Sequence, residues 1–175
     1  MSTDPPIRQI VSDTGPLISL EKITGGYRFI RRLYGALVVP PAVIDELVAG
    51  QFQTKEAYLS HFDAEDFVVV KKLSETSSTE EIKRQTRHLD EGERQAIRLA
   101  LEQEMPLLIE EEAGREVARS LGIHISGISG QLLKAAREEA ISVEDASSKL
   151  VELLRAGRIN RQIFEAVHDA MKKEV

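Results

Sequence analysis

The segment RQIVSDTGPLISL, residues 8–20, joins a short apolar run to a helix-forming sequence through a single acid. We expect residues 7–11 to form a buried strand, since the run is short and bounded by polar residues. Asp13 would then stand just past the carboxyl end of that strand, where open α/β sheets place the groups that perform chemistry. The segment therefore predicts a functional sheet edge, at which Asp13 should have partners from elsewhere in the chain.

Further short apolar runs alternate with stretches whose apolar residues recur at helical spacing. We expect the remaining strands at residues 37–39, 67–70, 106–109 and 122–126. Strands that alternate with helices favour an α/β fold with a mainly parallel sheet wrapped by helices. A chain of 175 residues is expected to form one domain, residues 1–175. Within it, residues 1–140 would form the α/β core.

The last part of the chain, residues 141–175, reads as a helical extension. Two helices are expected at about residues 143–155 and 159–173, joined at AGRIN by a glycine helix stop. Each carries an apolar stripe that needs a surface to pack on. We expect this extension to pack either on the core of the same chain or on a dimer mate.

Composition excludes several classes of protein. The chain has no cysteine and opens without a charged and apolar leader, so we expect a cytoplasmic protein without disulfides. Its apolar runs fall far short of the roughly 20 residues that a membrane helix needs. The net charge of -6 argues against a protein that coats nucleic acid through a basic surface. An acidic site that binds cations can still act on a nucleic acid.

Four separated acidic stretches are expected to meet at the carboxyl edge of the sheet. They contain Asp13; Asp45 and Glu46; Asp90 and Glu93; and Glu110 and Glu111. Asp45 and Glu46 flank the apolar arc of their helix at nearly equal angles, so helical periodicity does not choose between them. Asp90 and Glu93 also have the spacing of a helix capping box. Acids after the fourth strand would equally suit the N-terminus of a helix.

Such a cluster of carboxylates implies a counter-charge. Two carboxylates about 4 Å apart repel by roughly 4 kcal/mol at an effective dielectric near 20, so cations or protons must accompany them. The four histidines share no metal-like spacing, and ligands that are all oxygen favour hard cations such as Mg²⁺ or Mn²⁺. These ions support phosphodiester hydrolysis. Arg84 and Arg87, in a basic cluster before the third acidic stretch, could contact the substrate or form a solvated helix face.

Four strings in order carry a resemblance to a known family. They are VSDTGPLISL, VVPPAVIDEL, LDEGERQAIRLALE and PLLIEEEAGREVARSLGIHISGISGQLLKA, and together they cover most of the chain. They closely resemble PIN-domain proteins, in particular a bacterial and archaeal subgroup related to the toxins of toxin–antitoxin pairs. The resemblance implies a three-layer α/β/α fold with extra C-terminal helices and a metal-dependent ribonuclease activity.

The resemblance also assigns roles residue by residue. Asp13 matches the aspartate of the first strand, Thr14 the neighbouring hydroxyl residue, Glu46 rather than Asp45 the second acid, and Glu93 the third, with Asp90 as an auxiliary. Glu110 and Glu111 fall where the subgroup usually has aspartates. Glutamate is one methylene longer, which displaces a ligand when metal distances tolerate only a few tenths of an ångström. This departure bears on activity rather than on fold.

The resulting hypothesis is an endoribonuclease that uses Mg²⁺ or Mn²⁺. Its expected catalytic residues are Asp13, Glu46, Glu93 and Glu110; its metal ligands are these four with Asp90 and Glu111; its substrate-binding residues are Thr14, Arg84 and Arg87. The alternative is a catalytically silent PIN-like module that binds RNA or a regulatory protein. The resemblance further implies a small antitoxin as a possible partner, and a homodimer.

Overall fold

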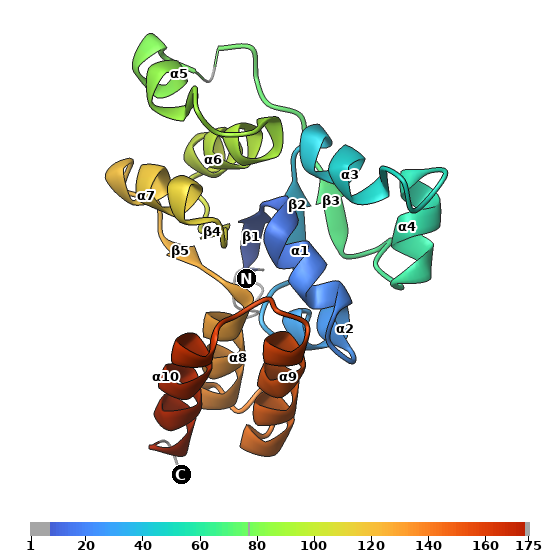
Figure 1. The fold of residues 1–175 in the computed structure, drawn as a ribbon. Coiled ribbons are helices and arrows are strands. Elements are labelled where there is room, and N and C mark those ends of the chain that lie inside the picture. The colour runs from blue at the N-terminus through green and yellow to red at the C-terminus, as the bar shows by residue number, and fades with distance from the viewer. Residues whose placement is uncertain (1–7, 77, 174–175) are drawn as a thin grey trace, which may run out of the picture.

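The computed structural model describes residues 8–76 and 78–173 of the chain (Figure 1). At its centre lies a five-stranded sheet in which every neighbouring pair of strands is parallel, in the order β3-β2-β1-β4-β5. The strands are β1 (Gln9–Ser12), β2 (Ala36–Val39), β3 (Val68–Val70), β4 (Leu107–Leu108) and β5 (Ile125–Ser126). The predicted parallel sheet is confirmed; β3, β4 and β5 are shorter than expected, whereas β2 begins one residue earlier than expected. The expected start of the first strand, at Ile7, lies outside the described residues.

Helices connect the strands and enclose the sheet, which confirms the predicted α/β/α architecture. They are α1 (Thr14–Glu21), α2 (Gly26–Ile30), α3 (Pro41–Val48), α4 (Lys55–His61), α5 (Glu80–Thr86), α6 (Glu91–Gln103), α7 (Glu112–Ser120), α8 (Ile128–Arg137), α9 (Val143–Arg155) and α10 (Arg161–Lys172). Helix α6 packs on β1 and β4, and α3 packs against both α1 and α6. The contact between α3 and α6 brings the second and third acidic stretches of the sequence together.

The strand order places the first strand at a topological switch point. From β1 the chain passes to β2 on one side, and it later returns to β4 on the other side of β1. Ser12 is in register with Leu108, and the Asp13 N–H donates to the Leu108 carbonyl at 2.9 Å. Ligand sites of open α/β sheets lie outside the carboxyl ends of strands at such a point. Asp13 is therefore fixed by the backbone where such sites occur.

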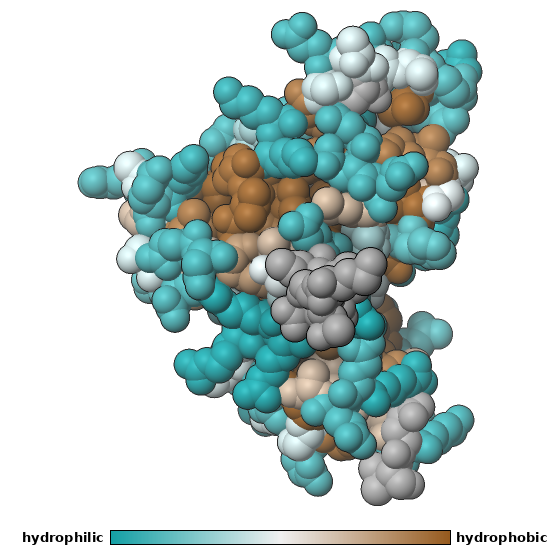
Figure 2. Space-filling view, turned by 180° about the vertical axis from the view of Figure 1, so that it is seen from behind, coloured by the Kyte–Doolittle hydropathy of each residue, from teal (hydrophilic) through white to brown (hydrophobic). Residues whose placement is uncertain are grey.

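The hydrophobic core forms around the central strands. Side chains of β1, β2 and β4 pack with those of α6, including Val11, Leu37, Leu107 and Ile97, all fully buried. Among the described residues, only two large apolar side chains are strongly exposed, Val69 and Ile163. Seen from behind, apolar areas gather on the upper half of the molecule within a largely hydrophilic surface (Figure 2). In the described ranges, no helix has the length and apolar character needed to cross a bilayer.

Helices α8, α9 and α10 stand side by side below the sheet in Figure 1, and each contacts the other two. Leu150 and Leu153 of α9 and Met171 of α10 are fully buried in this group. Ile163 of α10 remains 41% exposed, so part of the apolar stripe of α10 faces outward. Helix α8 also contacts α1, and through this contact the three helices reach the end of the sheet that carries Asp13.

Candidate active site at the carboxyl edge of the sheet

Asp13 is a buried acid at the start of α1. Its side chain is 3% exposed and forms no cap hydrogen bond to the helix that it precedes. Within the described part of the chain, its Oδ1 atom has no hydrogen-bond partner. Burial, opposed by the Thr14 backbone N–H and reinforced by the charges of Glu93, Asp90 and Glu46, raises the pKa of Asp13 to about 7. Asp13 thus lies among acids whose negative charges add to the effect of its burial.

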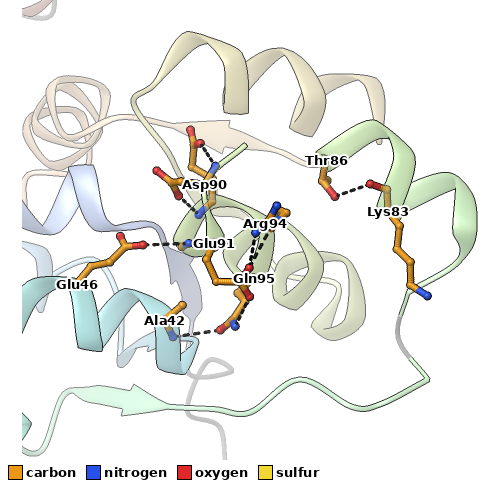
Figure 3. A network of polar contacts seen from close by, with 10 residues as sticks. Ala42, Glu46, Lys83, Thr86, Asp90, Glu91, Arg94 and Gln95 are labelled. Atoms are coloured by element: carbon orange, nitrogen blue, oxygen red, sulfur yellow. Dashed lines mark hydrogen bonds and ion pairs between the residues drawn. The ribbon is translucent and has the colours of Figure 1, made fainter. Parts of the chain in front are cut away.

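Asp90 and Glu93 form the predicted capping box at the start of α6 (Figure 3). Asp90 Oδ1 accepts from the Glu93 N–H at 2.8 Å, and Glu93 Oε2 accepts from the Asp90 N–H at 3.2 Å. The second carboxylate oxygen of Glu93, Oε1, is buried and has no partner among the residues described. Burial and the charges of Asp90, Glu111 and Glu46 raise the pKa of Glu93. The capping box therefore orients the Glu93 carboxylate but leaves its Oε1 without a hydrogen-bond donor among the described residues.

Glu46 is the acid of α3 that reaches this cluster. Its Oε1 accepts from the Gly92 N–H at 3.1 Å, and its Oε2 accepts from the Thr14 hydroxyl. Figure 3 shows Glu46 pointing across to the first turn of α6. The neighbouring Asp45 is exposed, and its side chain makes no hydrogen bond or ion pair with the described residues. The contact geometry thus separates two acids that helical periodicity left equivalent.

The acids after β4 divide between two environments. Glu111 stands at the N-cap position of α7, is exposed, and contributes to the raised pKa of Glu93. Glu110 is half-buried, and both of its oxygens have donors: Ile128 N–H at 3.1 Å on Oε1, and the Ser19 hydroxyl at 2.8 Å and Arg158 Nη2 at 3.2 Å on Oε2. Glu110 is therefore engaged with α1, α8 and the loop between α9 and α10.

The two arginines expected to contact the substrate lie at the end of α5. Both are exposed. Arg84 forms an ion pair with Glu81 on the same helix, whereas the Arg87 side chain has no partner in the described ranges. No bond in the structure connects either arginine to the acidic cluster, so their role stays a prediction.

Arg158 and Ser19 belong to this site although no motif in the sequence indicates them. Arg158 lies in the AGRIN segment, whose glycine predicts only a helix stop, and Ser19 lies within an apolar helix. Ser19 is fully buried, and its hydroxyl links Arg158 Nε, at 2.9 Å, to Glu110. A serine among the apolar positions Leu17, Ile18 and Leu20 was the available signal, because buried hydroxyls need hydrogen-bond partners.

The acidic cluster suits a hard divalent cation in its donor chemistry. All its side-chain donors are oxygens, and two buried carboxylate oxygens, Asp13 Oδ1 and Glu93 Oε1, lack partners within the described residues. An assembled cage is not formed: among residues 8–76 and 78–173, no three His, Asp or Glu side chains are arranged so that they could hold a metal ion. Glu46 in particular is occupied by Thr14 and Gly92. The case for a divalent cation at this cluster therefore rests on the two carboxylate oxygens without donors and on the negative charge of the acids.

Comparison with known proteins places these features in one family. Residues 9–173 match a family model described as a PIN domain. The match spans every strand and helix that the structure describes, from β1 to α10. A search of curated proteins finds no match.

Proposed function

Because the chain belongs to the PIN-domain family, we propose that it is a metal-dependent endoribonuclease that hydrolyses phosphodiester bonds of RNA. PIN domains have a nuclease fold, and the acidic cluster lies at the switch point of this sheet. The observation that carries the proposal is the pair of buried carboxylate oxygens, Asp13 Oδ1 and Glu93 Oε1, that have no hydrogen-bond partner in the described part of the chain. Buried carboxylate oxygens without donors are costly unless a cation or proton meets them.

The proposed cation is Mg²⁺ or Mn²⁺. It would be held by Asp13 and Glu93, with Glu46, Asp90 and Glu111 as the neighbouring acids. When bound, such an ion supplies activation of water and stabilisation of the leaving oxygen. Glu110, also expected as a ligand from the sequence, is bonded to Arg158 and Ser19 in the structure.

The remaining residues would position these acids and the RNA. The Leu108 carbonyl fixes the backbone of Asp13, and the Asp90 N–H orients the Glu93 side chain by donating to its Oε2. Thr14 holds Glu46 in the cluster through its hydroxyl. Arg84 on α5 and Arg87 at its C-cap, both exposed, would attract the RNA backbone toward an otherwise acidic edge.

The test is cleavage of a mixed panel of labelled RNAs in Mn²⁺, Mg²⁺ or EDTA. Wild-type protein should cleave with metal and not with EDTA, and Asp13→Asn should lose cleavage while keeping its circular dichroism spectrum. Asp45→Asn is the matched control, because Asp45 is an exposed acid next to Glu46 without a side-chain contact in the described residues. Unchanged cleavage by Asp13→Asn would refute the assignment.

A second candidate is a catalytically silent PIN-like module that binds RNA or a regulatory protein. The absence of an assembled metal cage among the described residues, and the engagement of Glu110 by Arg158, favour it. Wild-type protein that binds RNA but neither binds Mn²⁺ at millimolar concentration nor cleaves would support this candidate.

The biological role that we propose is that of a toxin in a toxin–antitoxin pair, acting in the cytoplasm as a homodimer. It rests on the likeness of the four motif strings to toxin-like PIN proteins. We also propose that residues 1–175 form one domain, with the C-terminal helices as part of it. A small upstream gene for a DNA-binding protein, and a dimeric mass in analytical ultracentrifugation, are the expected findings. A monomeric mass at micromolar concentration would contradict the dimer.

A further inference from the structure

Glu110 has a set of partners that differs from that of the other acids. Its two oxygens accept three hydrogen bonds, from a backbone N–H, a hydroxyl and a guanidinium. A carboxylate has about four lone-pair sites, so little capacity remains for another ligand. Asp13 and Glu93, in contrast, each keep a buried oxygen without a partner among the described residues.

Arg158 reaches Glu110 from the far end of the chain. Arg158 follows Gly157, whose φ of 70° turns the chain sharply after α9. The Arg158 N–H donates back to the Leu153 carbonyl. Its side chain then donates from Nε to Ser19 Oγ at 2.9 Å and from Nη2 to the Gly15 carbonyl at 3.0 Å. Gly15 lies two residues after Asp13, so Arg158 is fixed beside the first turn of α1.

These bonds argue against Glu110 as a metal ligand. If Glu110 turned toward a cation, the Ser19 hydroxyl, the Ile128 N–H and the Arg158 guanidinium would each lose a hydrogen-bond acceptor. A half-buried guanidinium that has lost its carboxylate partner destabilises the fold. The guanidinium would also repel a divalent cation held by the same carboxylate. The same geometry leaves Arg158 Nη1 without a partner among the described residues, on a side chain that is 27% exposed.

We propose that Glu110 and Arg158 form a positioning pair: Glu110 does not bind metal but fixes Arg158, whose remaining Nη1 N–H groups bind a phosphate of the RNA backbone. This inference rests on the proposed ribonuclease function and deepens it. A polyanion that approaches Asp13, Glu46 and Glu93 needs a cation at the rim of the site. A guanidinium already held by three bonds loses little conformational freedom when it binds a phosphate.

The first arm of the test measures Mn²⁺ binding by calorimetry, which does not require cleavage. Asp13→Asn should weaken Mn²⁺ binding by about tenfold or more, whereas Glu110→Gln should change it by less than about threefold. Gln keeps the length of the side chain and one acceptor oxygen, so the fold should tolerate it. Loss of Mn²⁺ binding in a folded Glu110→Gln variant, as large as in Asp13→Asn, would overturn the proposal.

The second arm measures the KM and kcat of RNA cleavage. Arg158→Gln should raise KM for RNA cleavage by about tenfold with a smaller effect on kcat, and Arg158→Lys should restore part of the loss. Glu110→Gln should raise KM in the same direction, and the double variant should be little worse than Arg158→Gln alone. Arg161→Gln is the matched control, because Arg161 is an exposed arginine near the same loop without a side-chain partner in the described ranges. An unchanged KM in Arg158→Gln would refute the role of Arg158.

Failure of the proposed function can be told apart from failure of this inference. If wild-type protein neither binds Mn²⁺ nor cleaves RNA, the ribonuclease proposal fails. Binding of uncleaved RNA in EDTA, followed by fluorescence anisotropy, then still tests Arg158: the Arg158→Gln variant should bind about tenfold more weakly than wild type and Arg161→Gln should not. Equal affinity of all three, or no RNA binding by wild type, would overturn the inference.

Discussion

The carboxylate of Glu46 occupies the space in which a Cβ atom on Gly92 would stand. Both oxygens of Glu46 lie 2.6 Å from that position, and the Gly92 N–H donates to one of them at 3.1 Å. The glycine in the first turn of α6 therefore admits an acid from α3 into the cluster around Asp13 and Glu93.

Replacing Gly92 by alanine should displace Glu46 rather than unfold the protein. The clashing atoms are the end of a flexible side chain, and alanine is about 1 kcal/mol better than glycine inside a helix. We expect the free energy of unfolding to change by no more than about 1 kcal/mol, and Mn²⁺ affinity and cleavage to fall about tenfold. Urea unfolding and calorimetry measure the two effects.

The control for this variant is Gly130→Ala in α8. A Cβ on Gly130 would meet only the Ser126 hydroxyl within 4 Å, away from Glu46. It should leave Mn²⁺ affinity unchanged. Equal Mn²⁺ affinities of Gly92→Ala and wild type would show that Glu46 in its present position does not contribute to cation binding.

Asp13 should make the metal-free protein less stable as pH rises. Its pKa is about 7 in the folded state against 3.8 as the ordinary value, so between these pH values the folded state holds a proton that the unfolded state has released. The free energy of unfolding contributed by Asp13 is therefore fully present below pH 3.8 and is lost as pH rises through 7. A neutral Asn at this position removes the contribution of residue 13 to the pH dependence of stability. Above pH 7 the free energy of unfolding of Asp13→Asn should exceed that of wild type by about 1 to 4 kcal/mol, since one pKa unit corresponds to about 1.4 kcal/mol.

Urea unfolding in EDTA between pH 5 and pH 8 measures this difference. Asp45→Asn is again the control, because an exposed acid without a side-chain contact in the described residues should not alter the profile. If the profiles of wild type and Asp13→Asn run parallel over this range, the folded-state pKa of Asp13 is not raised.

The sequence predicted the parts of this fold that local pattern encodes. Apolar runs that alternate with helices were enough for the parallel sheet, and the spacing of Asp90 and Glu93 was enough for the capping box. Periodicity could not choose between Asp45 and Glu46, because both are exposed on α3. The choice depends on contacts of Glu46 with residues 32 and 46 positions away.

The link between Arg158 and Ser19 lay beyond sequence reasoning for the same reason. The two residues are 139 positions apart, and the bond depends on how the C-terminal helices pack against α1. The position of Glu110 after the fourth strand was enough to predict it at the edge of the sheet, but its partners depend on how the C-terminal helices pack. Which acids bind metal thus stays a prediction, whereas the family and the fold are established.

Variants of Asp90 should distinguish its role as the N-cap of α6 from a role in cation binding. Asn caps helices about as well as Asp, so Asp90→Asn should keep the free energy of unfolding within about 0.5 kcal/mol, whereas Asp90→Ala should lose about 1 kcal/mol. If the charge of Asp90 also serves the acidic cluster, Asp90→Asn should weaken Mn²⁺ binding despite its intact cap. Thermal unfolding together with calorimetry distinguishes the roles; unchanged Mn²⁺ affinity in Asp90→Asn would assign Asp90 to capping alone.

Arg87 should contribute more to RNA binding than Arg84, although both lie on the same basic segment. Arg84 is already paired with Glu81, whereas the Arg87 side chain is exposed and has no partner in the described ranges. A phosphate contact by Arg87 releases a counterion, so Arg87→Ala should lower the slope of log affinity against log salt by about 0.7 to 1 for single-stranded RNA. Arg84→Ala should change the slope less, because Glu81 already neutralises its charge. Anisotropy titrations in EDTA at several salt concentrations measure both slopes, and equal slopes for Arg87→Ala and wild type would exclude a phosphate contact by Arg87.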